Sequence, residues 1–93
     1  MMFESLKPST RKNKRFMMVF SDPKLTVHFG DASGSTYIDH KDKTKRYNYI
    51  KRHSVNEDYS TVNPGSASRF ILWGDSTSLD KNLMDYIKRF NLK

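Results

Sequence analysis

The chain has 93 residues, of which 35% are hydrophobic, and a formal net charge of +7 at pH 7. This length suits a single domain near the lower limit of what folds without disulfides or metals. The absence of cysteine excludes a disulfide framework and a thiolate zinc site, and it favours a reducing, intracellular location. No run of about 18 apolar residues predicts a membrane span.

The positive charge is confined to one part of the chain. Residues 1–53 contain 12 Lys and Arg against 5 Asp and Glu, whereas residues 54–93 contain 5 of each. Neutralising phosphates is the commonest use of a one-sided basic surface, so the asymmetry favours a polyanionic partner. The alternative is that the basic excess serves solubility alone.

The first residues show no sustained hydrophobic period, and the segment from Lys7 to Arg15 carries five cations in nine residues. We therefore predict a flexible basic arm over residues 1–14 and a single compact domain over residues 15–93. Basic arms follow phosphates or enter a minor groove when nucleic acid is present. A solvated tail or a nuclear-import patch would have the same composition.

Two runs with a period of two residues follow, over residues 15–20 and 25–30, and an Asp-Pro turn separates them. This pattern predicts a β-hairpin. The alternation places six large side chains on one face, namely Phe16, Met18, Phe20, Leu25, Val27 and Phe29. The loop over residues 30–35 lacks the spacing of a phosphate-binding or dinucleotide-binding motif, so we interpret it as a turn.

A basic helix is predicted next, capped by Asp39 or Asp42 and extending to about His53. Tyr47 and Ile50 are the centre of its expected buried stripe. A second line of side chains, at spacings of four, three and four, faces away from that stripe: Lys41, Lys45, Asn48 and Arg52. Such a helix can bind phosphates while a tyrosine stacks on a base or a sugar. The alternative is that its tyrosines are buried in the core.

The densest apolar run in the second half of the chain covers residues 70–73 and includes the only tryptophan. A segment that is apolar on all sides is expected to be buried, so we predict a short central helix over residues 66–73. Gly74 would end it in a left-handed cap, and a buried strand is the alternative. Arg69 within the run would extend to solvent or pair with a carboxylate.

A last helix is predicted after a capping box formed by Thr77 and Asp80. Leu79, Leu83 and Phe90, with Tyr86 or Ile87 between them, repeat at helical spacing and would cover the hairpin. Together these elements predict an α+β fold in which a β-hairpin packs against two or three short helices.

The sequence contains no recognisable catalytic motif. The histidines fit no His-Glu-x-x-His pattern, and no serine lies in a Gly-x-Ser-x-Gly elbow. A small metal-dependent nuclease using Asp39, His40 and Asp42 is the most concrete enzymatic alternative. We predict that the protein is not an enzyme and that it uses no metal or cofactor.

Six short runs carry a resemblance to one group of proteins, in this order: Lys14-Arg15-Phe16, Val27-His28-Phe29-Gly30, Asp39-His40-Lys41-Asp42, Arg46-Tyr47, Arg52-His53 and Ser68-Arg69-Phe70-Ile71-Leu72-Trp73-Gly74. They resemble small basic proteins of the nucleocytoplasmic large (giant) DNA viruses, a group classed as a domain of unknown function. The resemblance covers roughly residues 6–92. It implies a viral source and a place in the virion, with the host cytoplasm or nucleus as the location during infection. It implies no catalytic residue and no ligand.

The function that we predict is binding of nucleic acid, double-stranded DNA above all, with little sequence readout. The cations of the arm and the basic helix would contact phosphates rather than bases; they are Arg11, Lys12, Lys14, Arg15, Lys41, Lys43, Lys45, Arg46, Lys51 and Arg52. The alternative is a minor capsid or cement protein that lies between other virion proteins. No membrane partner is expected, and the sequence leaves the oligomeric state open.

Overall fold

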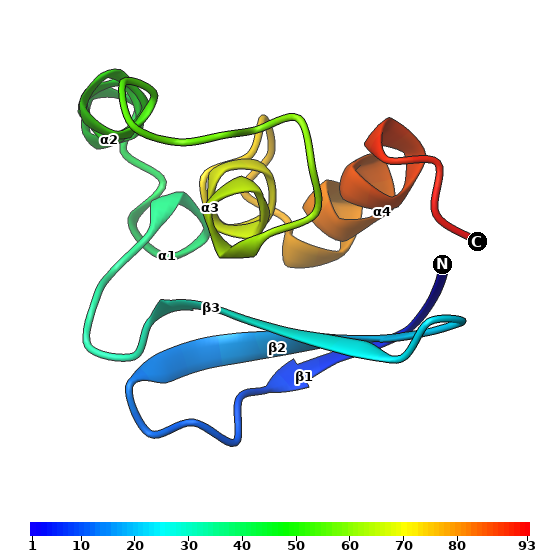
Figure 1. Cartoon of the computed structure of the whole chain (residues 1–93). Coiled ribbons are helices and arrows are strands. Elements are labelled where there is room, and N and C mark those ends of the chain that lie inside the picture. Colours follow the sequence, from blue (N-terminus) through cyan, green and yellow to red (C-terminus); the bar gives the residue numbers. More distant parts are fainter.

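The structure, a computed structural model, describes all residues from 1 to 93. Its elements in chain order are β1 (Met2–Pro8), β2 (Lys14–Ser21), β3 (Leu25–Asp31), α1 (Tyr37–His40), α2 (Lys43–His53), α3 (Pro64–Ala67), the π-helical segment η1 (Ser68–Leu72) and α4 (Leu79–Arg89). The strands form one antiparallel sheet in the order β1-β2-β3, and the helices cover one of its faces (Figure 1). The predicted α+β class is confirmed. No helix combines the length and the apolar character that crossing a bilayer requires.

The predicted hairpin is confirmed as β2 and β3. Phe16 lies opposite Phe29 and Met18 opposite Val27, so the expected apolar face is continuous across both strands. Met18, Val27 and Phe29 are buried beneath the helices and form the floor of the core. Leu25, which was predicted on the same face, is 41% exposed at the turn end of the hairpin.

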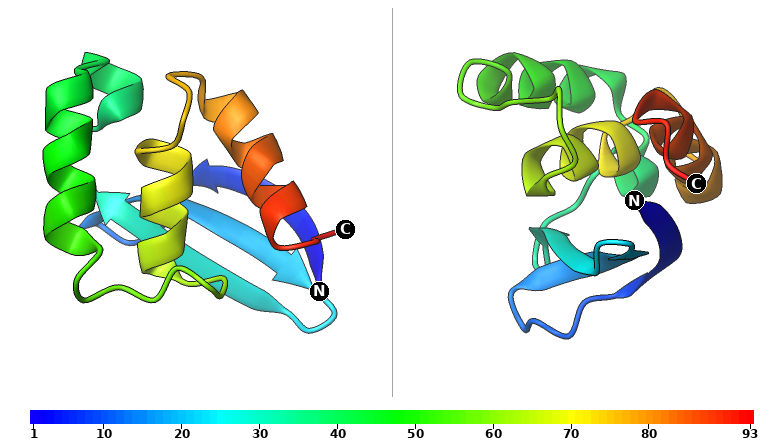
Figure 2. Two further views of the ribbon diagram at one scale, coloured as in Figure 1. Left: turned by 90° about the horizontal axis from the view of Figure 1, so that it is seen from above. Right: turned by 45° about the vertical axis from the view of Figure 1, so that its right-hand side comes forward.

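The prediction of a flexible arm over residues 1–14 is wrong. Residues 2–8 form β1, which pairs with β2, and Phe3 and Leu6 pack against the core. The amide of Phe3 donates a hydrogen bond to the carbonyl oxygen of Lys93 at 2.7 Å, so the two ends of the chain lie side by side (Figure 2). The compact domain therefore begins at Met2 rather than at residue 15.

The apolar side chains of β1 do not alternate with a period of two residues, because the register of its pairing with β2 shifts between Phe3 and Ser5. A β-bulge adds one residue to one strand, so side chains three positions apart can lie on the same face. Phe3 pairs with Phe20 and Leu6 pairs with Met18, and both partners face the core.

The central helix predicted over residues 66–73 is confirmed as α3 followed directly by η1, and the strand alternative is excluded. Asn63 caps its start, where the side-chain oxygen accepts a hydrogen bond from the amide of Ser66 at 2.9 Å. Ile71 and Leu72 are buried in the core. Arg69 forms no ion pair; its guanidinium donates to the carbonyl oxygen of Trp73 at 3.0 Å.

The left-handed cap predicted at Gly74 is wrong, because the only glycine with a positive φ is Gly30. Gly74 is needed instead for space, since a Cβ atom there would lie 2.7 Å from Cγ of Asn82. Asn82 is itself buried, and its side-chain amide donates to the carbonyl oxygens of Ile71 at 2.9 Å and Ser76 at 2.7 Å. This amide fastens η1 to α4.

The last helix is confirmed as α4, although its cap differs from the prediction. Ser78 is the N-cap, and its hydroxyl accepts from the amide of Lys81 at 3.3 Å, so the capping box of Thr77 and Asp80 is wrong. Tyr86 is fully buried, and its hydroxyl lies 2.7 Å from that of Ser66. The predicted apolar face therefore packs into the core chiefly against η1, and Tyr86 also contacts α3 through Ser66.

Candidate nucleic-acid interface

Helix α2 lies on the outside of the helical layer, farther from the sheet than α1 (Figure 1). Asp42 caps it, as one of the two predicted alternatives, and accepts hydrogen bonds from the amides of Thr44 at 2.9 Å and Lys45 at 3.2 Å. None of its residues is buried. Between Lys43 and His53 the helix has five Lys and Arg and no Asp or Glu, so its charge is entirely positive apart from its cap.

The inner side of α2 differs from the predicted stripe. The half-buried residues are Arg46, Tyr49, Ile50 and His53, at spacings of three, one and three. Tyr47, predicted to be buried, is 63% exposed. The apolar pattern alone assigned the wrong tyrosine, because the first position of the true stripe is an arginine.

Stacked rings connect α2 to the end of η1. The ring of Tyr49 lies parallel to that of Trp73, with 4.2 Å between centroids and 4° between planes, and it also stacks on His53 at 4.3 Å. Burial raises the pKa of Tyr49 to about 12, as expected for a ring that packs inside the protein. Tyr49 therefore packs α2 against the end of η1 and is not part of the outer surface of the helix.

Arg46 is a structural link and not a free phosphate contact. Its Nε donates to the carbonyl oxygen of Gly74 at 2.8 Å, and its Nη2 pairs with Asp75 at 2.7 Å. The guanidinium also lies 5.4 Å from the ring centre of Tyr37. The sequence marked Arg46 as a cation, but only the tertiary structure shows that its donors are already used.

Arg15 is committed in the same way. Its guanidinium forms two hydrogen bonds with the carboxylate of Asp39, at 2.6 Å and 2.7 Å, which join β2 to α1. The hydrogen bonds from Arg15 hold the pKa of Asp39 well below its usual range, and those to Asp39 raise the pKa of Arg15. Arg15 and Arg46, both predicted as phosphate contacts, are thus bound to carboxylates of the protein instead.

The other eight predicted contacts form no ion pair. The ion pairs of the structure are Arg15–Asp39, Arg46–Asp75 and Lys81–Asp85. We call the eight unpaired cations the basic surface: Arg11, Lys12, Lys14, Lys41, Lys43, Lys45, Lys51 and Arg52. Seven of them are exposed and Lys14 is half-buried.

Arg11 and Lys12 lie in the turn between β1 and β2 and not in a mobile arm. The amide of Lys14 donates to the carbonyl oxygen of Arg11 at 3.2 Å, and the amide of Ser9 donates to the carbonyl oxygen of Arg15 at 3.1 Å. A turn closed by such bonds presents its cations in a restricted position, so less conformational entropy is lost when they bind.

Lys41 precedes α2 and is not part of it. It ends α1 in the left-handed conformation, with φ of 58°. The predicted line of Lys41, Lys45 and Arg52 along one helix is therefore wrong. On α2 itself the exposed cations are Lys43, Lys45, Lys51 and Arg52.

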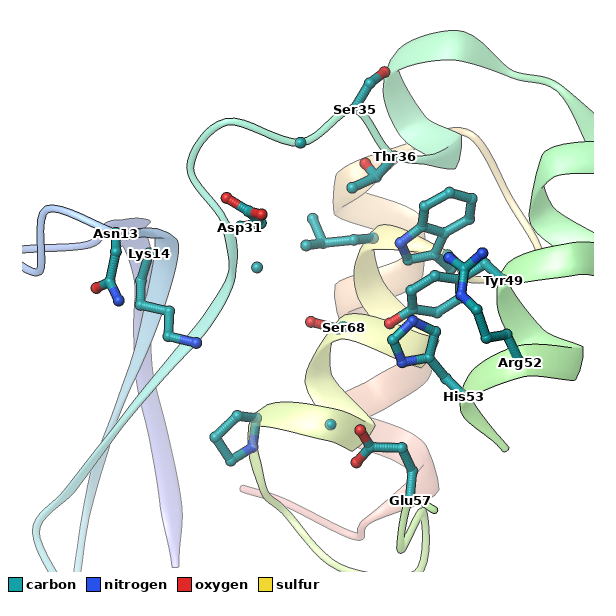
Figure 3. A pocket seen from close by; sticks show the side chains of 16 residues that line it. Asn13, Lys14, Asp31, Ser35, Thr36, Tyr49, Arg52, His53, Glu57 and Ser68 are labelled. Carbon is teal, nitrogen blue, oxygen red and sulfur yellow. The ribbon is translucent and has the colours of Figure 1, made fainter. Parts of the chain in front are cut away.

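A cleft of about 640 Å³ separates the end of the sheet from α2 and α3 (Figure 3). Asn13, Lys14 and Asp31 line one side, and Tyr49, Arg52, His53, Glu57 and Ser68 line the other. Two carboxylates balance the two cations inside, so the cleft is close to neutral. The unpaired cations lie mainly on the two elements that flank it, the β1–β2 turn and α2.

The residues proposed for a nuclease are used elsewhere. Arg15 holds Asp39, the amide of Asp42 donates to Nδ1 of His40 at 2.9 Å, and Asp42 caps α2. No three His, Cys, Asp or Glu side chains gather in a way that could hold a metal ion. Ser9 and His28 lie 2.7 Å apart, but neither lines the cleft. That the protein is not an enzyme stays a prediction.

One protein family matches this chain. Its model, described as a family of unknown function (DUF5754), matches residues 4–53. The matched segment contains nearly all of the sheet together with α1 and α2, and so the whole basic surface. Searches of curated proteins and of solved structures gave no match.

Proposed function

The chain belongs to this family of unknown function (DUF5754), and we propose that it binds nucleic acid, principally double-stranded DNA, through phosphate contacts without reading the base sequence. The observation that carries the proposal is the basic surface of eight cations without ion-pair partners. Six of them lie on the β1–β2 turn and on α2, which flank one cleft, and the other two are Lys14 at the start of β2 and Lys41 at the end of α1. Because the sequence resembles small basic proteins of large DNA viruses, we propose that the DNA it binds is that of such a virus.

The types of cation support phosphate contacts over base readout. Six of the eight are lysines, whose ammonium groups act as strongly hydrated point charges on flexible stems. Base readout in a major groove usually depends on planar side chains held in fixed positions, such as arginine against guanine. The two arginines best fixed in this structure, Arg15 and Arg46, are both bound to carboxylates.

A pair of matched triple variants tests the proposal. One replaces Lys43, Lys45 and Lys51 by glutamine, and the control replaces Lys24, Lys88 and Lys93, which are also exposed and unpaired. Both lower the net charge equally, so only the position of the lost charges differs. The affinity of each protein for two unrelated DNA duplexes is measured by fluorescence anisotropy over a series of salt concentrations.

On our proposal, the variant in α2 binds both duplexes more weakly, and its slope of log affinity against log salt falls by about 2.7, since each lost phosphate contact contributes about 0.9. The control keeps a slope close to that of the wild-type protein. Equal losses in both variants would show that net charge, and not the basic surface, governs binding. A wild-type protein that binds neither duplex at low salt would refute the proposal and favour the minor capsid or cement role, which co-assembly with shell protein would then test.

A further inference from the structure

The outer face of α2 carries an aromatic ring that the fold does not use. Tyr47 is 63% exposed and is the only aromatic residue among the large hydrophobic side chains that are exposed. It takes part in none of the aromatic pairs or cation–π contacts of the structure, and its hydroxyl has no hydrogen-bond partner within the protein. Most of the side chain is therefore open to solvent, and no aromatic, cation–π or hydrogen-bond partner within the protein occupies the ring.

Two members of the basic surface flank this ring. Lys43 and Lys51 lie four residues before and four residues after Tyr47 on α2, a spacing that puts all three side chains on the same face of a helix. Neither lysine forms an ion pair. The stripe along the helix is thus a cation, an aromatic ring and a second cation.

We infer that this stripe binds single-stranded nucleic acid, with an unpaired base stacked on Tyr47 and the neighbouring phosphates held by Lys43 and Lys51. The inference rests on the proposed function and adds a second form of ligand to it. Sites for single strands combine a positively charged track with exposed rings, because every base has a face on which it can stack. In an intact duplex those faces are covered by neighbouring base pairs, so the ring would contribute little to duplex binding.

The variants Tyr47→Ala and Tyr47→Phe test the inference. Met84→Ala is the control, because Met84 is also a large exposed side chain, 58% exposed, but lies on α4. Three probes are compared at one salt concentration: oligothymidine, a strand of equal length made of abasic sites, and a duplex of the same length. The abasic strand has the phosphates of oligothymidine without its bases. Thermal melting of each variant establishes that it is folded. Because Tyr47 and Met84 are both exposed, we expect their replacement to change the melting temperature little.

Tyr47→Ala should weaken binding of oligothymidine by roughly 5- to 150-fold, which corresponds to the loss of about 1 to 3 kcal/mol for one stacked base. Binding of the abasic strand and of the duplex should change by less than about twofold, and Tyr47→Phe and Met84→Ala should behave as the wild-type protein does. An unchanged affinity of Tyr47→Ala for oligothymidine, or an equal loss for all three probes, would overturn the inference while leaving phosphate binding in place. If the wild-type protein binds none of the probes, the proposed function itself fails.

Discussion

Strand β1 makes a sharp test of the fold, because residues 2 and 3 lie next to each other and differ in burial. The ring of Phe3 packs edge-on against Phe20 with 5.9 Å between centroids and belongs to the periphery of the core, whereas Met2 is 46% exposed. Replacing either residue by alanine changes the β-propensity of the same strand in the same direction. The two variants therefore differ mainly in the packing that they remove.

Truncating a fully buried phenylalanine typically lowers the free energy of unfolding by about 3 to 5 kcal/mol. Phe3 is only half-buried, so we expect Phe3→Ala to lower it by about 2 kcal/mol, which corresponds to a fall in melting temperature of about 10 °C for a domain of this size. Met2→Ala should change the free energy of unfolding by less than about 0.5 kcal/mol.

Urea denaturation followed by the fluorescence of Trp73 measures both variants. Equal midpoints for Phe3→Ala and Met2→Ala would show that β1 does not pack as described. Deleting residues 1–8 removes the whole strand and leaves Met18 and Phe20 without their partners on one side. We expect that protein to lose its cooperative transition, and a truncated protein that melts as the full chain does would restore the flexible-arm interpretation.

Three further predictions concern the helices and the Arg15–Asp39 ion pair. Asn82→Ala should lower the free energy of unfolding by about 1 to 3 kcal/mol in urea denaturation, because it leaves the buried carbonyl oxygen of Ile71 unpaired. Gly74→Ala should lower the melting temperature, because the added Cβ would lie too close to the carbonyl oxygen of Phe70 and to the side chain of Asn82, and an unchanged melting temperature would contradict that packing. Asp39→Asn should be less stable than the wild-type protein at pH 7. Since the pKa of Asp39 is depressed in the folded state, its contribution is complete above the unfolded value of 3.8 and is lost as the pH falls below it. The stability of the two proteins should therefore converge on acidification, and parallel pH curves would refute that role.

Local sequence signals predicted those elements whose side chains follow one regular period. The alternation in β2 and β3 and the helical spacing in α4 both appear in the structure because one face of each element packs into the core. The other face of β2 is also covered in part, since Met17 on that face is buried. The cap of α2 at Asp42 was also predictable, since a short acidic side chain can satisfy free amides within its own turn. These features depend on neighbours that are close in sequence.

The errors arose where distant partners decide the structure. The bulge in β1 forms in the pairing with β2, and an irregularity of this kind cannot be predicted from a regular spacing of apolar residues. Arg46 occupies an inward position on α2 because the carbonyl oxygens of Trp73 and Gly74 accept its hydrogen bonds, 27 and 28 residues away in the chain. Composition alone gave the number of cations, but it could not separate those bound to carboxylates from those that are free.

The attachment of α2 has a consequence for its motion. A helix without a single buried residue, fastened by Arg46 and by the stacking of Tyr49, has few contacts to break before it separates from the body of the protein. Segments of this kind open locally at a lower free energy than the whole domain. The backbone amides of α2 should therefore exchange with deuterated water faster than those of β2, and bound phosphates should slow that exchange by neutralising the charges that repel one another along the helix.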